Sequence, residues 1–466
     1  MTAPIGQSTQ SVVDIFKRVY GDLNNLVPDT NYLAQQIPFG EGMKVGDRYV
    51  EAFVLTNEVG ITLAGTGQDA FDINPAGAGV VKQSEIIPSQ SLMTSVLPFA
   101  FISRGAAGGD KAFFDSTKHV MKNHVKSHSR VLETMRLHGQ RTSLLGYTSF
   151  DPAGTVYRGA TFSGDGTVTL TKSDGTTIAF TNGVNVASKA ILVRKGYFAA
   201  GNFVGLEGMA IAQIDSTGAI AGGGVWQDDR SANGASGKIT GVDADLGIVY
   251  VNFTPEVAAA QSGAGSMRLA FRGMEEAKEA VGIVKILENE GTLFGTSAAS
   301  YSLWKSSKLS CQSKKFSLRA VEVGVAQAMN RSDLDSGLRI LINPRSFANL
   351  ITDEAALRKY DGSYSKEATN GFESIKFYAA NGVNEIVPHR MILEGEALGL
   401  DFGNWSRSGS AEISFRVPGI DKEIIFPAEN NAGWIVRSFS DQYMFCHAPA
   451  RQILFTDIND EAASSF

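Results

Sequence analysis

Two β-forming segments joined by a long glycine-rich stretch are the feature that most constrains the fold of this chain. Residues 48–56 and 81–87 are rich in β formers, and residues 92–101 form a third such segment. The stretch between the first two, residues 64–79, contains mostly small residues and has few large apolar side chains. The pattern predicts a long β-hairpin arm with a pliable tip over residues 43–104. A two-stranded arm is barely stable alone in water, so we expect a neighbouring subunit to complete it.

A short amphipathic helix is predicted ahead of the arm, over residues 11–27. Its apolar residues recur at three- and four-residue spacing, and Pro28 ends it. A helix of this length is marginal alone in water, so we expect it to dock on another surface.

The longest predicted helix covers residues 110–145. One stripe of this helix is apolar, and it consists of Phe114, Met121, Val125, Leu132 and Met135. A second ridge is basic, and it consists of Lys118, Lys122, Lys126 and Arg130. Like charges four residues apart on a helix repel each other. Two interpretations stay open: a solvated face, or a face turned toward an acidic neighbour or DNA.

Residues 150–272 show a different pattern of short strands and glycine-rich turns. In residues 167–171, Val168 and Leu170 alternate with threonines. Further strands are expected at residues 177–180, 191–193, 248–253 and 267–271. The pattern predicts an inserted all-β domain, either a small barrel or a sandwich.

The rest of the chain mixes helices and strands, which makes the fold class α+β. Helices are expected over residues 274–290, 317–330 and 343–360, and the last of these begins with Asn343 as N-cap and Pro344 as its first residue. Strands are expected at residues 338–342, 412–417, 423–426, 434–439, 443–446 and 453–455.

Composition excludes several classes of protein. The formal charge of −6 argues against general nucleic-acid binding, which requires a surplus of Lys and Arg. The two cysteines, Cys311 and Cys446, offer no disulfide framework and fit folding in a reducing cytosol. We expect no signal peptide at the N-terminus, and no membrane segment, because no apolar run approaches roughly 20 residues.

Motifs for catalysis, metals and cofactors are not found, so we expect neither an enzyme nor a cofactor. The sequence has no phosphate-binding loop, dinucleotide fingerprint or nucleophile elbow. His124 and His128 stand four residues apart on the long helix, a spacing that can bind a metal, but no third ligand is evident. Packing roles are favoured for both, and His128 is expected to be a hydrogen-bonded core histidine.

Three stretches together resemble the major capsid proteins of tailed double-stranded DNA bacteriophages. The first is residues 291–295 (GTLFG), followed by 298–301 (AASY) and 303–305 (LWK). It is similar to a family segment in which a glycine-rich turn precedes a Tyr and a Trp-Lys pair. The second is residues 339–344 (RILINP) with Phe347 and Leu350, and the third is residues 434–439 with Asp441, Tyr443, Cys446 and Pro449. The order of these parts matches as well.

The resemblance implies an HK97-like capsid fold with an inserted all-β domain. The expected parts are an N-terminal arm (1–42), an extended loop or E-loop (43–104), the spine helix of a peripheral domain (105–149), the insertion (150–272), an axial domain (273–410) and returning strands of both domains (411–466). The arm and the extended loop would contact neighbouring subunits. The contact residues expected on them are Phe16, Val19, Arg48, Tyr49, Phe53 and Phe71.

The same resemblance implies the partners and the location. Hexamers and pentamers would close an icosahedral shell in the virion, assembled in the host cytoplasm around double-stranded DNA without sequence-specific binding. Only about forty residues precede the extended loop, so a separate scaffolding protein is implied, together with a portal protein and room for a decoration protein.

One rival hypothesis is another virion component, such as a tail or receptor-binding protein that uses the β domain to bind carbohydrate. Exposed aromatic clusters would be typical of such a domain, and Trp226 is the only tryptophan in the insertion. An enzyme on a mixed scaffold is a third hypothesis, and the sequence offers no convergent His, Asp, Glu and Ser set for it.

Overall fold

A computed structural model gives the fold. The structure describes residues 31–62, 77–97, 110–140, 200–214, 236–251, 279–351, 375–415 and 433–460, without residues 41, 43, 46 and 245–247. It also describes short strands at residues 146–147, 156–157, 160–162, 167–171, 177–181, 189–192, 268–271 and 425–427.

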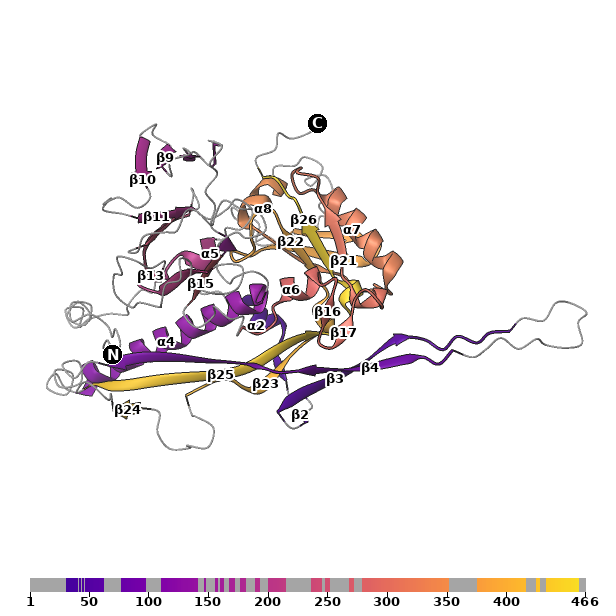
Figure 1. Cartoon of the computed structure of the whole chain (residues 1–466), viewed down its shortest axis with the longest axis horizontal. Helices are drawn as coiled ribbons and strands as arrows, with labels where there is room; N and C mark the ends of the chain where they lie inside the picture. Colours follow the sequence, from indigo (N-terminus) through magenta and orange to yellow (C-terminus); the bar gives the residue numbers. More distant parts are fainter. Residues whose placement is uncertain are drawn as a thin grey trace, which may run out of the picture.

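A long helix lies along an extended sheet in the main body of the molecule (Figure 1). The helix is α4 (Asp110–His138), and the sheet has the order β1-β23-β25-β24, with β5 paired to β25. Its strands are β1 (Phe39–Gly40), β5 (Ser89–Leu97), β23 (Trp405–Ser414), β24 (Ile425–Pro427) and β25 (Trp434–Cys446). Two strands were predicted at residues 434–439 and 443–446, but the structure has a single strand of 13 residues there, β25. The short helix α2 (Tyr32–Gln36) precedes β1.

α4 ends seven residues before its predicted end because another segment presses on its last turn. A Cβ atom on Gly139 would lie 2.0 Å from the carbonyl oxygen of Ala280. The backbone nitrogen of Gly282 donates a hydrogen bond to the carbonyl of Gly139 at 2.9 Å. This contact also corrects the helix predicted over residues 274–290: residues 279–282 are not helical, and the described part of that range contains α6 (Ile283–Glu288) as its helix.

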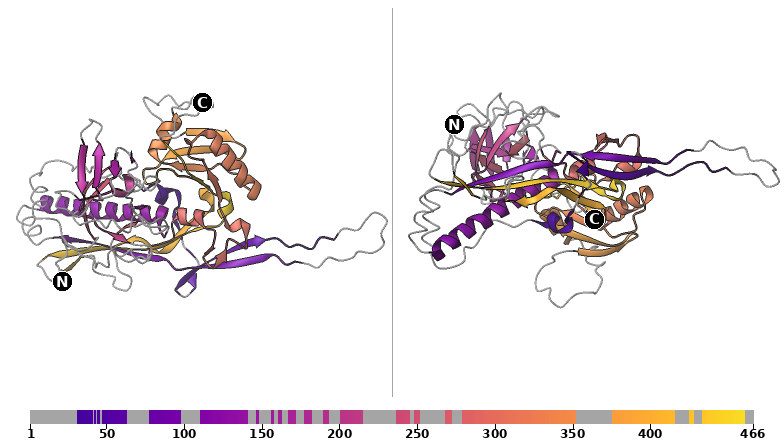
Figure 2. Two further views of the ribbon diagram at one scale, coloured as in Figure 1. Left: turned by 45° about the horizontal axis from the view of Figure 1, so that its top comes forward. Right: turned by 90° about the horizontal axis from the view of Figure 1, so that it is seen from below.

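The predicted arm forms in part: its first two segments pair as a hairpin that projects from the body of the molecule in all three views (Figures 1 and 2). Its third predicted segment, β5, instead pairs with β25 in the sheet along α4. β3 (Arg48–Thr56) pairs antiparallel with β4 (Val80–Ile86), and β2 (Lys44–Val45) pairs with the start of β3. A bridge between Val59 and Gly77 extends the ladder. We call β3, β4 and residues 57–62 and 77–79 the hairpin arm.

A second body is built around a six-stranded sheet of order β18-β26-β22-β19-β21-β20. Helices α7 (Leu318–Arg331) and α8 (Pro344–Ile351) share its apolar core. The predicted cap is confirmed, because the Asn343 side chain accepts a hydrogen bond from the nitrogen of Arg345 at 2.9 Å. At the start of α7, the Ser317 side chain accepts one from the nitrogen of Ala320. The strands are β18 (Ser307–Ser310), β19 (Arg339–Ile342), β20 (Ile375–Ala379), β21 (Gly382–Pro388), β22 (Ala397–Leu400) and β26 (Ile453–Thr456).

The predicted end of α8 near residue 360 lies outside the described residues. Short 3-10 turns stand at η4 (Ser302–Trp304), η5 (Phe402–Asn404) and η6 (Pro449–Arg451).

Between residues 146 and 271 the described strands form two sheets. One has the order β10-β9-β8-β7, and the other β11-β14-β13-β12-β15-β6. The second sheet packs on α4, because Leu132 and Met135 of α4 share one apolar core with Phe203, Ile211 and Val249. The strands are β6 (Gly146–Tyr147), β7 (Val156–Tyr157), β8 (Ala160–Phe162), β9 (Thr167–Thr171), β10 (Thr177–Thr181), β11 (Lys189–Leu192), β12 (Ala210–Ile214), β13 (Ser236–Asp243), β14 (Ile248–Val251) and β15 (Arg268–Phe271), with the short helix α5 (Ala200–Phe203) among them. A separate inserted domain remains a prediction.

Within the described residues, no helix has the length and apolar character needed to span a membrane.

Candidate assembly surfaces

The hairpin arm exposes aliphatic side chains that its own chain does not cover. Val54 and Val81 face each other across the two strands and are 61% and 63% exposed. Farther out, Val59 is 69% exposed and Ile61 is 77% exposed. Aliphatic groups concentrated on a projecting two-stranded arm mark a surface that another protein can bury.

The opposite face of the arm is attached to the body through aromatic rings. Phe53 stacks on Trp304, with ring centroids 4.4 Å apart and an interplanar angle of 7°. Tyr49 packs against Tyr443 at 4.9 Å, and the Tyr443 hydroxyl donates to a carboxylate oxygen of Glu51 at 3.1 Å. Burial and the nearby Glu51 carboxylate raise the pKa of Tyr443, so it keeps its donated proton. The arm is therefore held at its root and extended beyond it.

We call Phe294, Tyr301, Trp304, Tyr443 and Phe445 the aromatic socket of the arm. All five residues belong to one apolar cluster with Tyr49 and Leu55 of the arm. Three of them come from residues 291–305, the segment that carries the first family resemblance, and the other two come from β25.

The turn that presents Phe294 is conformationally unfavourable for an aromatic residue. β16 (Thr292–Leu293) and β17 (Thr296–Ser297) pair around a two-residue turn in which Phe294 has φ 51° and Gly295 has φ 77°. A left-handed residue with a Cβ costs roughly 1–2 kcal/mol. The Phe294 ring packs 5.5 Å from that of Phe445, so the contact inside the socket offsets the strain. This gives a physical reason for the glycine-rich turn.

These contacts correct part of the expected set of inter-subunit residues. The prediction is wrong for Tyr49, which is 4% exposed and buried against its own chain. Phe53 also packs on its own chain. Arg48 is exposed and pairs with Glu85, so its contact with a neighbour stays a prediction. Phe16, Val19 and Phe71 lie outside the described residues.

The four exposed aliphatic residues are not among the contact residues expected from the sequence. β alternation separates Tyr49, Phe53 and Leu55 from Val54, but a periodic pattern does not say which face of a strand meets the body. The sequence predicts that the aromatic side chains of the arm contact a neighbouring subunit. In the structure, Tyr49 and Phe53 pack on their own chain, and the aliphatic side chain of Val54 is exposed.

The predicted basic ridge of α4 does not include its last residue, Arg130, which is buried. Arg130 is 5% exposed, and its guanidinium donates to the carbonyls of Gly201, at 2.7 Å, and Val204. Burial and the nearby Arg390 lower the pKa of Arg130 to about 10. Arg130 therefore ties α5 to α4 and does not face an acidic neighbour. Lys122 is exposed, Lys126 is half-buried, and the side chain of Lys118 lies outside the described residues.

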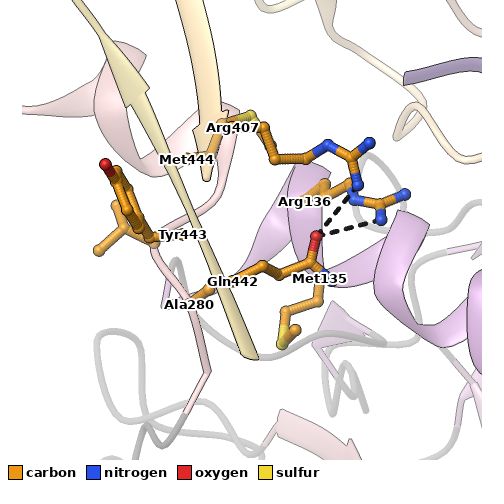
Figure 3. Close-up of a pocket in the computed structure, with 8 residues that line it drawn as sticks. Met135, Arg136, Ala280, Arg407, Gln442, Tyr443 and Met444 are labelled. Carbon is orange, nitrogen blue, oxygen red and sulfur yellow. Dashed lines mark hydrogen bonds between the residues drawn. The ribbon is translucent and has the colours of Figure 1, made fainter. Parts of the chain in front are cut away.

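Buried charges fasten α4 to the chain segments around it. Glu133 is fully buried and accepts hydrogen bonds from the nitrogen of Leu33, at 2.6 Å, and from Arg136, at 3.1 Å. Arg136 and Arg407 both donate to the side-chain oxygen of Gln442 at 3.2 Å (Figure 3). Arg136, Arg407 and Gln442 line a cavity of about 10 Å³, room for about one water molecule. The cluster joins α2, α4, β23 and β25.

The two histidines singled out in the sequence are packing residues, as predicted. His124 and His128 are each 2% exposed, and both lie 2.7 Å from the hydroxyl of Ser438 on β25. Among the described residues, no three His, Cys, Asp or Glu side chains gather as metal ligands would.

No protein-family model matches this sequence, and no curated protein matches it. Several solved structures are similar in outline. The capsid of cyanophage A-1(L) is 7% identical, with 94% of this chain and 95% of that chain covered and a TM-score of 0.45. The mature capsid of bacteriophage PhiM1 is 9% identical, with coverages of 94% and 90% and a TM-score of 0.40. An encapsulin complex from Synechococcus elongatus is 6% identical, with coverages of 97% and 98% and a TM-score of 0.37.

Proposed function

We propose that this chain is the major capsid protein of a tailed double-stranded DNA bacteriophage. In this role it is a structural subunit that assembles into hexamers and pentamers of an icosahedral head. A separate scaffolding protein, a portal protein and the packaged genome are the partners that this role implies. The observation that carries the proposal is the hairpin arm, rooted in an aromatic socket and exposing aliphatic side chains where its own chain cannot bury them.

Assembly would bury aliphatic side chains of the arm that are exposed in the isolated chain. Each fully buried valine stabilises by roughly 1.5–3 kcal/mol relative to an exposed one. Val54, Val59, Ile61 and Val81 are 61–77% exposed, so they gain only a small part of this stabilisation in the isolated chain. A neighbouring copy that covers the arm supplies that burial, and many copies repeated by symmetry close a shell. The arm has a stable root, so little ordering entropy opposes its docking.

Assembly should depend on the outward face of the arm. Replacing Val54 and Val81 by aspartate (V54D/V81D) places two like charges opposite each other on the surface that a neighbour would bury. We expect the variant to fold but to form at most a few per cent of the wild-type yield of closed particles. The measurement is negative-stain electron microscopy and sedimentation of the chain co-expressed with its scaffolding protein.

The control is the same kind of substitution on an exposed aliphatic residue away from the arm, Val323→Asp on α7, where Val323 is 42% exposed. Circular dichroism should show that both variants keep the wild-type helix and strand content, because exposed substitutions usually change stability by under about 0.5 kcal/mol. Wild-type yields of closed particles from V54D/V81D would refute the role of the arm. A wild-type chain that remains a monomer, or forms a fibre-like trimer, would refute the capsid function.

A further inference from the structure

Two buried histidines and three serines form a continuous hydrogen-bonded network between α4 and the sheet beneath it. The Ser95 hydroxyl lies 2.6 Å from Nδ1 of His124, and Nε2 of His124 lies 2.7 Å from the Ser438 hydroxyl. Nδ1 of His128 lies 2.7 Å from the same hydroxyl, and its Nε2 lies 2.9 Å from the Ser91 hydroxyl. We call these five residues the serine–histidine network. It joins one helix to both β5 and β25.

We propose that the serine–histidine network is an acid-released latch between α4 and the β5–β25 pair. With both histidines neutral, four hydrogens fill the four contacts in a single direction: Ser95 donates to His124, His124 to Ser438, Ser438 to His128, and His128 to Ser91. Every ring nitrogen then has a partner. The latch is closed when neither ring carries a charge.

When a histidine of the network gains a proton, the hydrogen bonds cannot be arranged as favourably as in the neutral state. One proton on Nδ1 of His128 reverses the three contacts from Ser95 to His128, leaves the contact from Nε2 to Ser91 unchanged, and buries a positive charge. With both rings protonated, Ser438 accepts two hydrogen bonds, and its own hydrogen has no acceptor inside the network. Two charged rings would then stand on adjacent turns of α4. Protonation therefore favours the state in which both rings reach water.

The surroundings of the pair oppose the charged form. Among the residues that the structure describes, the groups that face it are the hydroxyls of β5 and β25, the Phe415 ring 5.9 Å from His124, and the guanidinium of Arg136 on α4, and none of these is a carboxylate. Burial, His124 and Arg136 lower the pKa of His128 to about 4, and burial lowers the pKa of His124. Because the released rings have ordinary pKa values near 6.5, the latch is stable above that pH and weakens as pH falls toward 4.

The effect should be confined to one part of α4. Leu132 and Met135 hold the C-terminal half through an apolar core, and that contact does not depend on pH. Between pH 7 and pH 4 we expect the equilibrium between latched and released states to shift by on the order of 100-fold, from the lowered pKa of His128 alone. This inference concerns the chain itself and does not require that it build a shell.

Hydrogen exchange read by mass spectrometry tests the latch on the full chain at pH 7, 5.5 and 4.5, corrected for the intrinsic pH dependence of exchange. We expect residues 121–128 to lose protection as pH falls, while residues 132–138 keep theirs. The double variant His124→Gln/His128→Gln keeps a donor and an acceptor at both positions but cannot titrate, so residues 121–128 should stay protected at pH 4.5. His447→Gln, at an exposed histidine, is the matched control and should behave as wild type.

Equal protection of residues 121–128 in the wild type at pH 7 and pH 4.5 would overturn the proposal, and so would equal acid loosening in the double variant. If the double variant does not fold, exchange of the histidine C2 protons in the wild type decides the matter. Both His124 and His128 must titrate below the ordinary value of 6.5, and titration at or above it would overturn the latch.

Discussion

Replacement of Glu133 by glutamine (E133Q) is expected to lower the free energy of unfolding by about 3–5 kcal/mol, the usual loss when one partner of a buried ion pair is removed. Glu133 is the carboxylate bonded to Arg136, which is itself 5% exposed. Burial and Arg407 lower the pKa of Arg136, and Glu133 opposes that change. Without Glu133, a guanidinium stays buried beside a second one. Urea unfolding of dissociated subunits, followed by circular dichroism, measures the loss.

Glu290→Gln is the matched control for E133Q. Glu290 also pairs with a cation, Lys308, at 2.8 Å, but its side chain is 70% exposed. Solvent screens such a pair, so its loss should leave the unfolding transition where it is in the wild type. Coinciding transitions for the two variants would show that the Glu133–Arg136 pair does not hold α4 in place.

Trp304→Ala should have a comparably large effect, about 3–5 kcal/mol, because it removes a large buried aromatic side chain. Trp304 is 3% exposed and receives the Phe53 ring of the hairpin arm on its face. Its loss should also free the root of the arm. Hydrogen exchange of residues 48–56 and 80–86 should therefore accelerate well beyond that of α7, and particle assembly should fall with it.

Trp434→Ala tests whether the effect belongs to the socket. Trp434 is 40% exposed at the start of β25, so its removal should change stability little and leave exchange at the root of the arm unchanged. A Trp304→Ala variant whose arm exchanges as slowly as the wild type would contradict the socket's role as the anchor of the arm.

Local patterns in the sequence predicted many elements of the fold, but not four of the six strands of the sheet that contains β19 and β26. The β formers of β3 and the alternation in β9 predict their bounds to the residue, and the side chain of Asn343 marks one helix start. Alternation, capping and glycine-rich turns depend on neighbours within a few residues. The resemblance also directed attention to residues 291–305, which supply much of the aromatic socket.

Long-range packing decided what those patterns could not. The helix predicted over residues 274–290 was shortened by the close approach of Gly282 to Gly139. The pattern of the long helix predicts one apolar stripe and places Arg130 on a basic ridge, but the C-terminal half of α4 is enclosed on all sides. Charged residues there find partners from segments more than 60 positions away.

The sequence predicted the paired strands of the arm, the long helix α4 and packing roles for the two histidines on it. Only the tertiary structure decided which face of the arm meets the body, which charges are buried, and how His124 and His128 share one serine hydroxyl. The reason is physical: periodicity gives the sides of an element, but the neighbour that covers each side comes from elsewhere in the chain.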